Sequence, residues 1–207
     1  MPNPIQEQFG SRVIEAFAEF ARADLPTTDD HEQKTFDFVT DGNLRRNLAE
    51  VFYGVRWIYK LGLALLTRDE ERAAHVRAQI VDYASIAEGL LSYCLAHAIY
   101  KGHTSGARYQ WHDPLKQQRQ INWNQQSPEQ QMARQSFWWM IQIASDFGVI
   151  DAPLQRDLDW LRTQRNTVHL RARSSLGKTA FLNQSKRAFQ SVSKTIVQAR
   201  RWIAAHP

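Results

Sequence analysis

The residue types best suited to chemistry are concentrated in residues 161–170, which read Leu-Arg-Thr-Gln-Arg-Asn-Thr-Val-His-Leu. An α-helix repeats every ~3.6 residues, so Arg162, Asn166 and His169 fall on one narrow polar arc of a helical wheel. An imidazole titrates near neutral pH and can move a proton, while a guanidinium can hold a phosphate through two parallel hydrogen bonds. These three side chains on one helix face therefore predict a site that handles a proton and a phosphate together, as RNA cleavage requires.

The same segment resembles a known family. The pattern LRxxRNxVHL, which follows a predicted helix and the turn FGVID at residues 147–151, resembles the C-terminal signature of the HEPN superfamily. These are small all-α domains, many of them ribonucleases of toxin–antitoxin and anti-phage systems. Their motif is an arginine and a histidine with four to six residues between them. The run YASIAEGLL at residues 83–91 also resembles the HEPN helical hairpin.

Two arginines could serve as the arginine of this motif. Six residues lie between Arg162 and His169, and residues seven apart in a helix return to nearly the same face. Arg165 is followed by Asn166, as the family pattern favours, but it lies toward the apolar arc and only three residues separate it from the histidine. We therefore favour Arg162 and keep Arg165 as the alternative.

The resemblance implies metal-independent cleavage of RNA, in which the substrate's own 2′-hydroxyl attacks the adjacent phosphate and leaves a 2′,3′-cyclic phosphate. His169 would transfer protons, Arg162 would stabilise charge on the phosphate, and Asn166 would orient the imidazole or hold a phosphate oxygen. No cofactor or metal ion is expected. The superfamily also contains members without activity, so the alternative is a regulatory domain that only binds RNA or a partner. A third possibility is a helical scaffold with no nucleic-acid role.

The resemblance also implies partners. In the family, a homodimer brings two motifs face to face across a shared cleft, so we expect a homodimer here. A cognate antitoxin or another protein of a defence module is a further candidate partner.

Basic residues gather around the motif. Residues 1–103 contain 11 Lys and Arg against 15 Asp and Glu, whereas residues 104–207 contain 15 against 6. Such a basic field attracts polyanions, although a solvated basic helix face is the alternative interpretation. The residues that we expect to contact nucleic acid are Arg165, Arg171, Arg173 and Lys178.

Helices must position these residues, because Gly and Pro are scarce, at 9 and 7 residues, and alternating Val, Ile and Thr runs are absent. We expect an all-α fold, an antiparallel helical bundle of the HEPN type with short connections. Residues 1–41 would form an N-terminal helix and an acidic linker that pack on a helical domain of residues 42–207. Apolar residues at helical spacing predict helices over about residues 9–23, 43–66, 69–100, 127–147, 151–173 and 179–205.

Residues 103–127 interrupt the helical pattern. They are rich in Gln and Asn, with basic and aromatic residues interleaved, and we interpret them as an inserted loop. Such side chains could stack on and clamp single-stranded bases. The alternative is a surface loop held in place by its tryptophans.

Two single residues need a structural explanation. Glu88 lies within an apolar helix pattern, where a carboxylate needs a partner. It either reaches solvent at an edge or forms a buried ion pair with Arg165. Cys94 and His97 are three apart, but no second pair has metal-ligand spacing, so we expect a buried thiol rather than a zinc site. We expect His31 and the other scattered histidines to be exposed.

The composition is that of an ordinary globular chain. The 207 residues, 43% of them hydrophobic, are enough for one domain with a sizeable core. No apolar run approaches the ~18 residues of a membrane span, and the first residues lack the basic and apolar regions of a secretion signal. A single cysteine excludes an internal disulfide and is typical of a reducing compartment. We therefore expect a cytoplasmic protein with no membrane partner.

Overall fold

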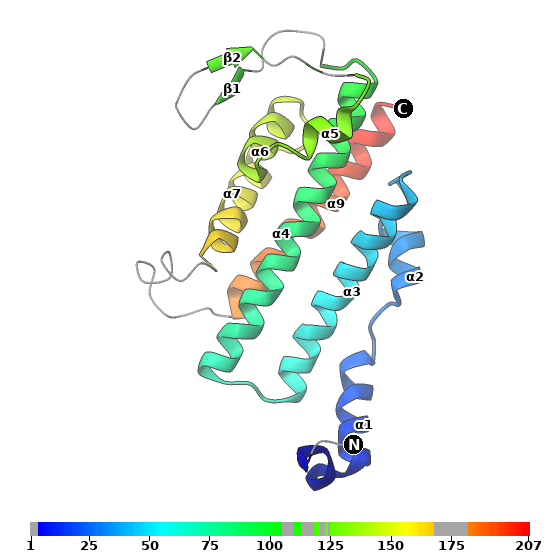
Figure 1. Cartoon of the computed structure of the whole chain (residues 1–207), viewed down its shortest axis with the longest axis vertical. Helices are drawn as coiled ribbons and strands as arrows, with labels where there is room; N and C mark the ends of the chain where they lie inside the picture. The colour runs from blue at the N-terminus through cyan, green and yellow to red at the C-terminus, as the bar shows by residue number, and fades with distance from the viewer. Residues whose placement is uncertain (1–3, 105–109, 113–117, 121–122, 124, 168–181) are drawn as a thin grey trace.

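The structure is a computed structural model that describes residues 4–104, 110–112, 118–120, 123, 125–167 and 182–207. The regular secondary structure of this part is helical except for one short hairpin (Figure 1). The predicted all-α class is therefore confirmed, whereas likeness to the HEPN fold stays a prediction. The elements are α1 (Pro4–Arg22), α2 (Thr28–Asp30), the π-helical turn η1 (His31–Thr35), α3 (Gly42–Ala64), α4 (Asp69–Tyr100), β1 (Gln110–His112), β2 (Gln118–Gln120), α5 (Pro128–Met132), α6 (Phe137–Asp146), α7 (Ala152–Asn166) and α9 (Leu182–Ala205).

Helix α4 lies at the centre of this arrangement. It packs against α3 on one side and against α6 and α7 on the other, and α9 passes behind it in the view of Figure 1. Helices α3 and α7 run antiparallel to α4. Helix α9 runs parallel to α4, because Gln79 near the start of α4 bonds to Ser185, while His97 near its end bonds to His206.

The core forms around α4 because this helix buries residues on more than one face. Cys94 is 0% exposed, and burial raises the pKa of its thiol to about 12. The predicted buried thiol is thus confirmed, and it stays protonated and unreactive at neutral pH. No helix in the described part of the chain is long and apolar enough to cross a membrane.

The segment predicted as an acidic linker contains two short helical turns. The Thr27 hydroxyl accepts a hydrogen bond from the Asp30 N–H, and the Asp30 carboxylate accepts one from the Thr27 N–H, both at 3.1 Å. This reciprocal capping box starts α2. The following turn, η1, places His31 in the core at 6% exposure, so the expectation of an exposed histidine is wrong there. Arg200 of α9 ties this segment down through a 2.6 Å bond to Asp37.

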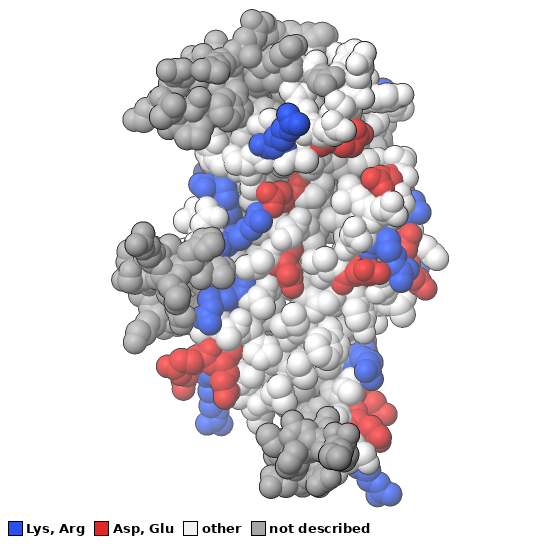
Figure 2. Space-filling model, viewed as in Figure 1, with Lys and Arg blue, Asp and Glu red and all other residues white. Residues whose placement is uncertain are grey.

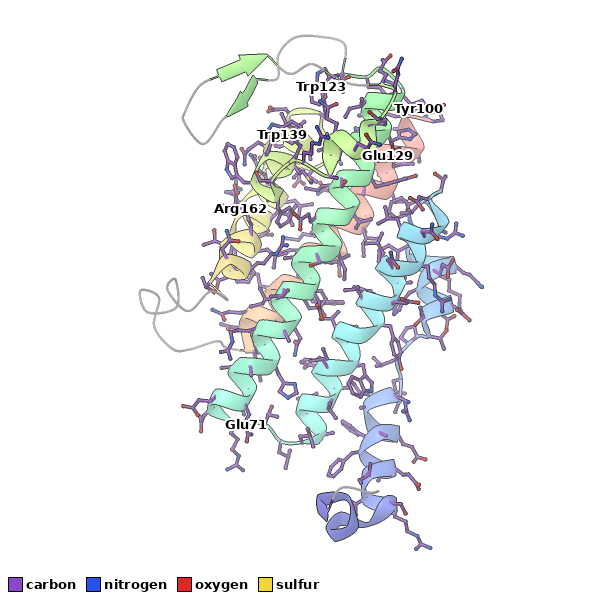
Figure 3. All side chains as sticks on the ribbon, viewed as in Figure 1. Glu71, Tyr100, Trp123, Glu129, Trp139 and Arg162 are labelled. Atoms are coloured by element: carbon purple, nitrogen blue, oxygen red, sulfur yellow. The ribbon has the colours of Figure 1, made fainter. Side chains whose placement is uncertain are left out.

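The predicted helix over residues 127–147 is wrong as a single element. It is divided into α5 and α6, because the Ser136 side chain accepts a hydrogen bond from the Trp139 N–H at 3.2 Å and begins a new helix. The preceding segment, predicted as a loop, contains the antiparallel β1–β2 hairpin. Trp123 packs against Trp139 and Phe147, with ring centroids 6.1 and 5.8 Å apart, as Figure 3 shows for the two tryptophans. The tryptophan-anchored alternative therefore holds at Trp123.

Helix α7 carries the first part of the motif. The Asp151 carboxylate accepts a 2.8 Å hydrogen bond from the Leu154 N–H and caps the helix where the sequence predicts its start. The apolar arc faces the core as predicted, with Leu154, Leu158 and Leu161 all 0% exposed.

The predicted end of this helix near residue 173 is wrong, because α7 ends at Asn166. The Thr167 hydroxyl and N–H both donate to the Gln164 carbonyl, at 2.7 and 3.1 Å, and this closes the last turn. Four predicted site residues lie in residues 168–181, outside the described part of the chain: His169, Arg171, Arg173 and Lys178.

His31 should make the stability of the protein depend on pH. Burial lowers the pKa of its imidazole from the ordinary value of 6.5; nearby Asp30 opposes this effect and Arg56 adds to it. The unfolded chain therefore binds the proton more readily, so the free energy of unfolding should be highest above pH 6.5 and fall as the solution is acidified. Urea denaturation between pH 8 and pH 5 should show this loss, and His31→Phe should reduce it. The exposed histidine variant His103→Gln is the control and should lose as much unfolding free energy between pH 8 and pH 5 as the wild type. If His31→Phe also loses as much, the burial of a neutral imidazole at His31 is contradicted.

Candidate functional site

A cleft lies between α4, α6 and α7, with a volume of about 430 Å³. It brings together three of the predicted site residues, Arg162, Arg165 and Asn166, all from the last turns of α7. Arg162 projects from α7 in Figure 3. The other lining residues come from α4, the start of α6 and the residue before it: Val81, Glu88, Ser136, Phe137 and Trp138.

Arg165 forms the ion pair with Glu88 that the sequence suggested as one of two alternatives. Arg165 Nη1 lies 2.5 Å from Glu88 Oε2, and the two side chains are 35% and 28% exposed. The pair is therefore half-buried rather than fully enclosed. It offsets much of the charge of Arg165 and fixes the guanidinium against α4.

Arg162 is less fully engaged than Arg165. Its Nε lies 3.5 Å from Asp159 Oδ1 and makes no hydrogen bond, although this atom is buried. Within the described chain, this is the one ion pair recorded for Arg162. A guanidinium carries five N–H donors, so Arg162 retains more capacity to bind an anion than Arg165 does.

Asn166 is the last residue of α7 and is exposed. It follows Arg162 by four residues, so the two side chains are neighbours on the surface of the helix. Both line the cleft. The predicted polar arc is thus present as far as α7 extends, and the histidine that would complete it lies three residues beyond the end of this helix.

The cleft also has an aromatic wall that was not predicted from the sequence. Phe137 is 5% exposed, and Trp138 is half-buried beside it, whereas the neighbouring Trp139 faces the core at 2% exposure. The run Ser-Phe-Trp-Trp at residues 136–139 contains a helix-start signal, because serine is a preferred N-cap residue. That signal places Phe137 and Trp138 in the first turn of a helix, but it does not indicate which ring lines the cleft.

Part of the basic field around the site is neutralised within the protein. Figure 2 shows Lys and Arg side chains gathered along the edge where α7 lies in Figure 1. On α7, Asp157 accepts hydrogen bonds from Arg187 and Lys194 of α9 at 3.1 and 3.0 Å. Burial alone would raise the pKa of Asp157, but the hydrogen bonds from Lys194 and Arg187, together with their positive charges, outweigh it and lower the pKa. The pairs hold α7 against α9 and leave Arg162 and Arg165 as the cations of the cleft.

The described residues contain no candidate metal site. No group of three or more His, Cys, Asp and Glu side chains among them could hold a metal ion. His97, which the sequence placed near Cys94, instead has its Nε2 atom 2.7 Å from the His206 carbonyl oxygen.

The ion pair across the cleft should be measurable as a coupling energy. In a double-mutant cycle of Glu88→Gln and Arg165→Gln, we expect a coupling of about 1 kcal/mol, at the upper end for partly exposed pairs. The cycle would be measured by urea unfolding. The matched control is the Arg46–Glu50 pair on α3, 48% and 55% exposed, which should give about 0.3–0.5 kcal/mol. A coupling no larger than the control would contradict a fixed Arg165.

Compared with known proteins, the chain matches no protein-family model, no curated protein and no solved structure.

Proposed function

We propose that the protein is a metal-independent endoribonuclease that binds single-stranded RNA in the cleft between α4, α6 and α7. The observation that carries this proposal is the convergence of Arg162, Asn166 and the aromatic wall on one cleft, at the end of the helix that leads toward His169. The motif resemblance supplies the reaction. In line with that resemblance, we propose a homodimer of the toxin or anti-phage defence type.

Binding would use the two kinds of side chain that line the cleft. The Arg162 guanidinium would hold an RNA phosphate, because its N–H donors are only partly engaged by Asp159. Trp138 lines the same cleft and would stack on an unpaired base, an interaction that tolerates any base. Asn166 would donate an amide N–H to a second phosphate oxygen.

Cleavage would begin with attack of the RNA 2′-hydroxyl oxygen on the adjacent phosphorus. The new oxygen–phosphorus bond closes the 2′,3′-cyclic phosphate, and the bond to the 5′-oxygen of the next nucleotide breaks. One proton leaves the 2′-hydroxyl and one must reach the departing 5′-oxygen. His169 would perform one of these transfers, and the same residue of a second subunit would perform the other.

One observation favours the alternative, an RNA-binding or partner-binding regulatory domain without cleavage. The Glu88 carboxylate lines the same cleft as the motif arginines. A fixed negative charge there opposes the negative charge that develops on the phosphate in the transition state. The two functions differ in one observable: the enzyme cleaves RNA and needs His169 to do so, whereas the binding domain binds RNA or a partner without cleaving RNA.

Cleavage of a mixed RNA pool in the presence of EDTA tests the enzyme proposal. We expect cyclic-phosphate ends from the wild type and a loss of at least 100-fold in rate for His169→Ala, since general acid–base catalysis contributes about 10²–10⁴. The melting temperature should not change. Arg201→Ala, which removes an exposed side chain of α9 outside the cleft, serves as the control and should cleave at the wild-type rate. Equal cleavage by wild type and His169→Ala would exclude this residue as the catalyst.

Equilibrium binding of labelled single-stranded RNA decides between the two arginines. Arg162→Gln should weaken binding about tenfold and reduce the salt slope by about one, as loss of one phosphate contact does. Arg165→Gln should have a smaller effect because Glu88 already occupies that guanidinium. A larger effect for Arg165→Gln than for Arg162→Gln would reverse the assignment of the motif arginine.

A further inference from the structure

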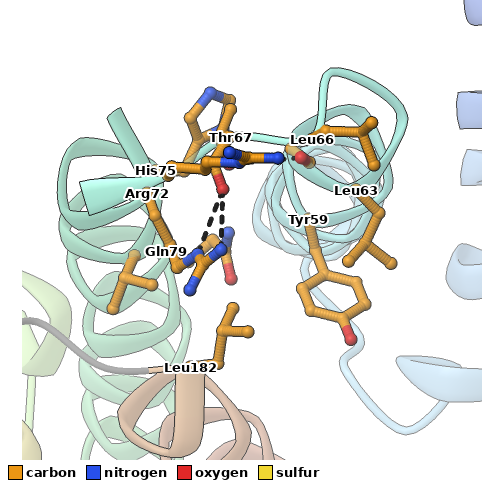
Figure 4. A pocket seen from close by; sticks show the side chains of 11 residues that line it. Tyr59, Leu63, Leu66, Thr67, Arg72, His75, Gln79 and Leu182 are labelled. Carbon is orange, nitrogen blue, oxygen red and sulfur yellow. Dashed lines mark hydrogen bonds between the residues drawn. The ribbon is translucent and has the colours of Figure 1, made fainter. Parts of the chain in front are cut away.

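A second cavity, of about 220 Å³, lies between the end of α3, the start of α4 and the first residue of α9 (Figure 4). In this view, Tyr59, Leu63 and Leu66 on the α3 side face Arg72 and Gln79 of α4. The cavity shares no lining residue with the cleft at α7. The proposed RNA function therefore does not account for it.

The inner wall of the cavity offers a hydrogen-bond donor. Gln79 is 2% exposed, and its Oε1 accepts a hydrogen bond from the Ser185 hydroxyl, which fixes the orientation of the carboxamide. The structure records no hydrogen bond from the Gln79 amino group to the residues that it describes. An acceptor atom inside the cavity would give this amino group a hydrogen-bond partner.

The outer wall carries positive charge. Arg72 donates from Nε and Nη2 to the Thr67 carbonyl at 3.1 and 3.0 Å, which places its guanidinium against the α3–α4 connection. Neither Arg72 nor its exposed neighbour Arg68 forms an ion pair with any residue of the described chain, although three acidic residues open α4. The charge at the mouth of the cavity is therefore available to an anion.

The rim of the cavity is apolar and includes Leu66, a leucine whose backbone conformation and exposure both destabilise the folded state. Leu66 has a φ of 50° and is 74% exposed. It occupies the position just after α3 where the Leu66 and Thr67 N–H groups bond back to Leu63 and Gly62. Glycine is favoured there because it adopts positive φ without strain. A leucine adds conformational strain and gains no burial, unless a bound molecule covers it.

We propose that this cavity binds a small amphipathic anion. Its apolar body would lie against Leu63, Leu66 and Leu182, and its carboxylate or phosphate would contact Arg72 and Arg68. An acceptor atom would reach the Gln79 amide. The volume corresponds to about seven water molecules, which suits a body the size of one six-membered ring.

NMR titration of the full-length protein with leucine methyl groups labelled tests the proposal. The probes are benzoate and phenyl phosphate, with benzyl alcohol as the neutral analogue and acetate as the anion without a body. We expect saturable shifts at Leu63, Leu66 and Leu182, with a Kd at least tenfold lower for one of the two aromatic anions than for either control. Preference between benzoate and phenyl phosphate identifies the head group. Equal binding of benzyl alcohol, or no saturation with any probe, would overturn the proposal.

Variants separate ligand binding from a role in folding. Leu66→Gly should raise the melting temperature by about 2–4 °C, because it relieves the positive-φ strain, and should weaken binding of the aromatic anion about fivefold. Arg72→Gln should weaken it at least tenfold. Leu65→Ala, which changes an exposed leucine that does not line the cavity, is the matched control and should leave binding unchanged. A stabilised Leu66→Gly protein with unchanged affinity would contradict a binding role for this leucine.

Discussion

Burial of α4 on several faces is the constraint on which the other helices depend. A helix covered from several directions must pair its polar side chains with its neighbours, since an unpaired polar group in the core is unfavourable. Three such pairs are spaced along α4, joining Gln79 to Ser185, Glu88 to Arg165 and His97 to His206. Each pair joins a different level of α4 to α7 or to the segment that contains α9. Together these pairs fix the axial positions of α7 and α9 relative to α4.

Both candidate sites arise where this polar pairing is incomplete. At the cleft, Glu88 engages Arg165 but leaves Arg162 with a buried Nε that has no hydrogen-bond partner. At the second cavity, the Gln79 side-chain oxygen accepts a hydrogen bond from Ser185, and the structure shows no hydrogen bond from its amino group to a described residue. In each case one side chain on α4 or α7 is held by a contact, while a neighbouring side chain that lines the cavity keeps hydrogen-bond donors without a partner. Fixed groups of this kind bind a ligand with little further loss of conformational entropy.

The sequence predicted elements best where local and tertiary preferences agree. Helix α4 begins and ends at the predicted residues, because its apolar spacing and the acidic residues of its first turn favour the same helix. The Asp151 cap was also derivable from one residue type in one context, whereas the Glu88–Arg165 pair was one of two alternatives that the sequence left open. The cleft residues on α7 follow from helical spacing alone.

The prediction failed where short-range hydrogen bonds compete with periodicity. Ser136 interrupts a continuous apolar pattern by capping α6, and the apolar spacing of residues 127–147 does not reveal this choice. His31 is buried by a π-helical turn that no periodic pattern marks. The aromatic wall at Trp138 needs three helices to be placed at once, so its contribution to the cleft could not be derived from one segment.

The parallel packing of α4 and α9 has a consequence for the order of folding. These two helices make the most extensive contact in the structure, yet about a hundred residues separate their paired positions, as in Gln79 and Ser185. Contacts so distant in sequence close late, because the intervening chain must first lose entropy. During synthesis, one face of α4 therefore stays uncovered until α9 has been made. The chain spends that interval with part of its most extensively buried helix open to chaperones and to other chains.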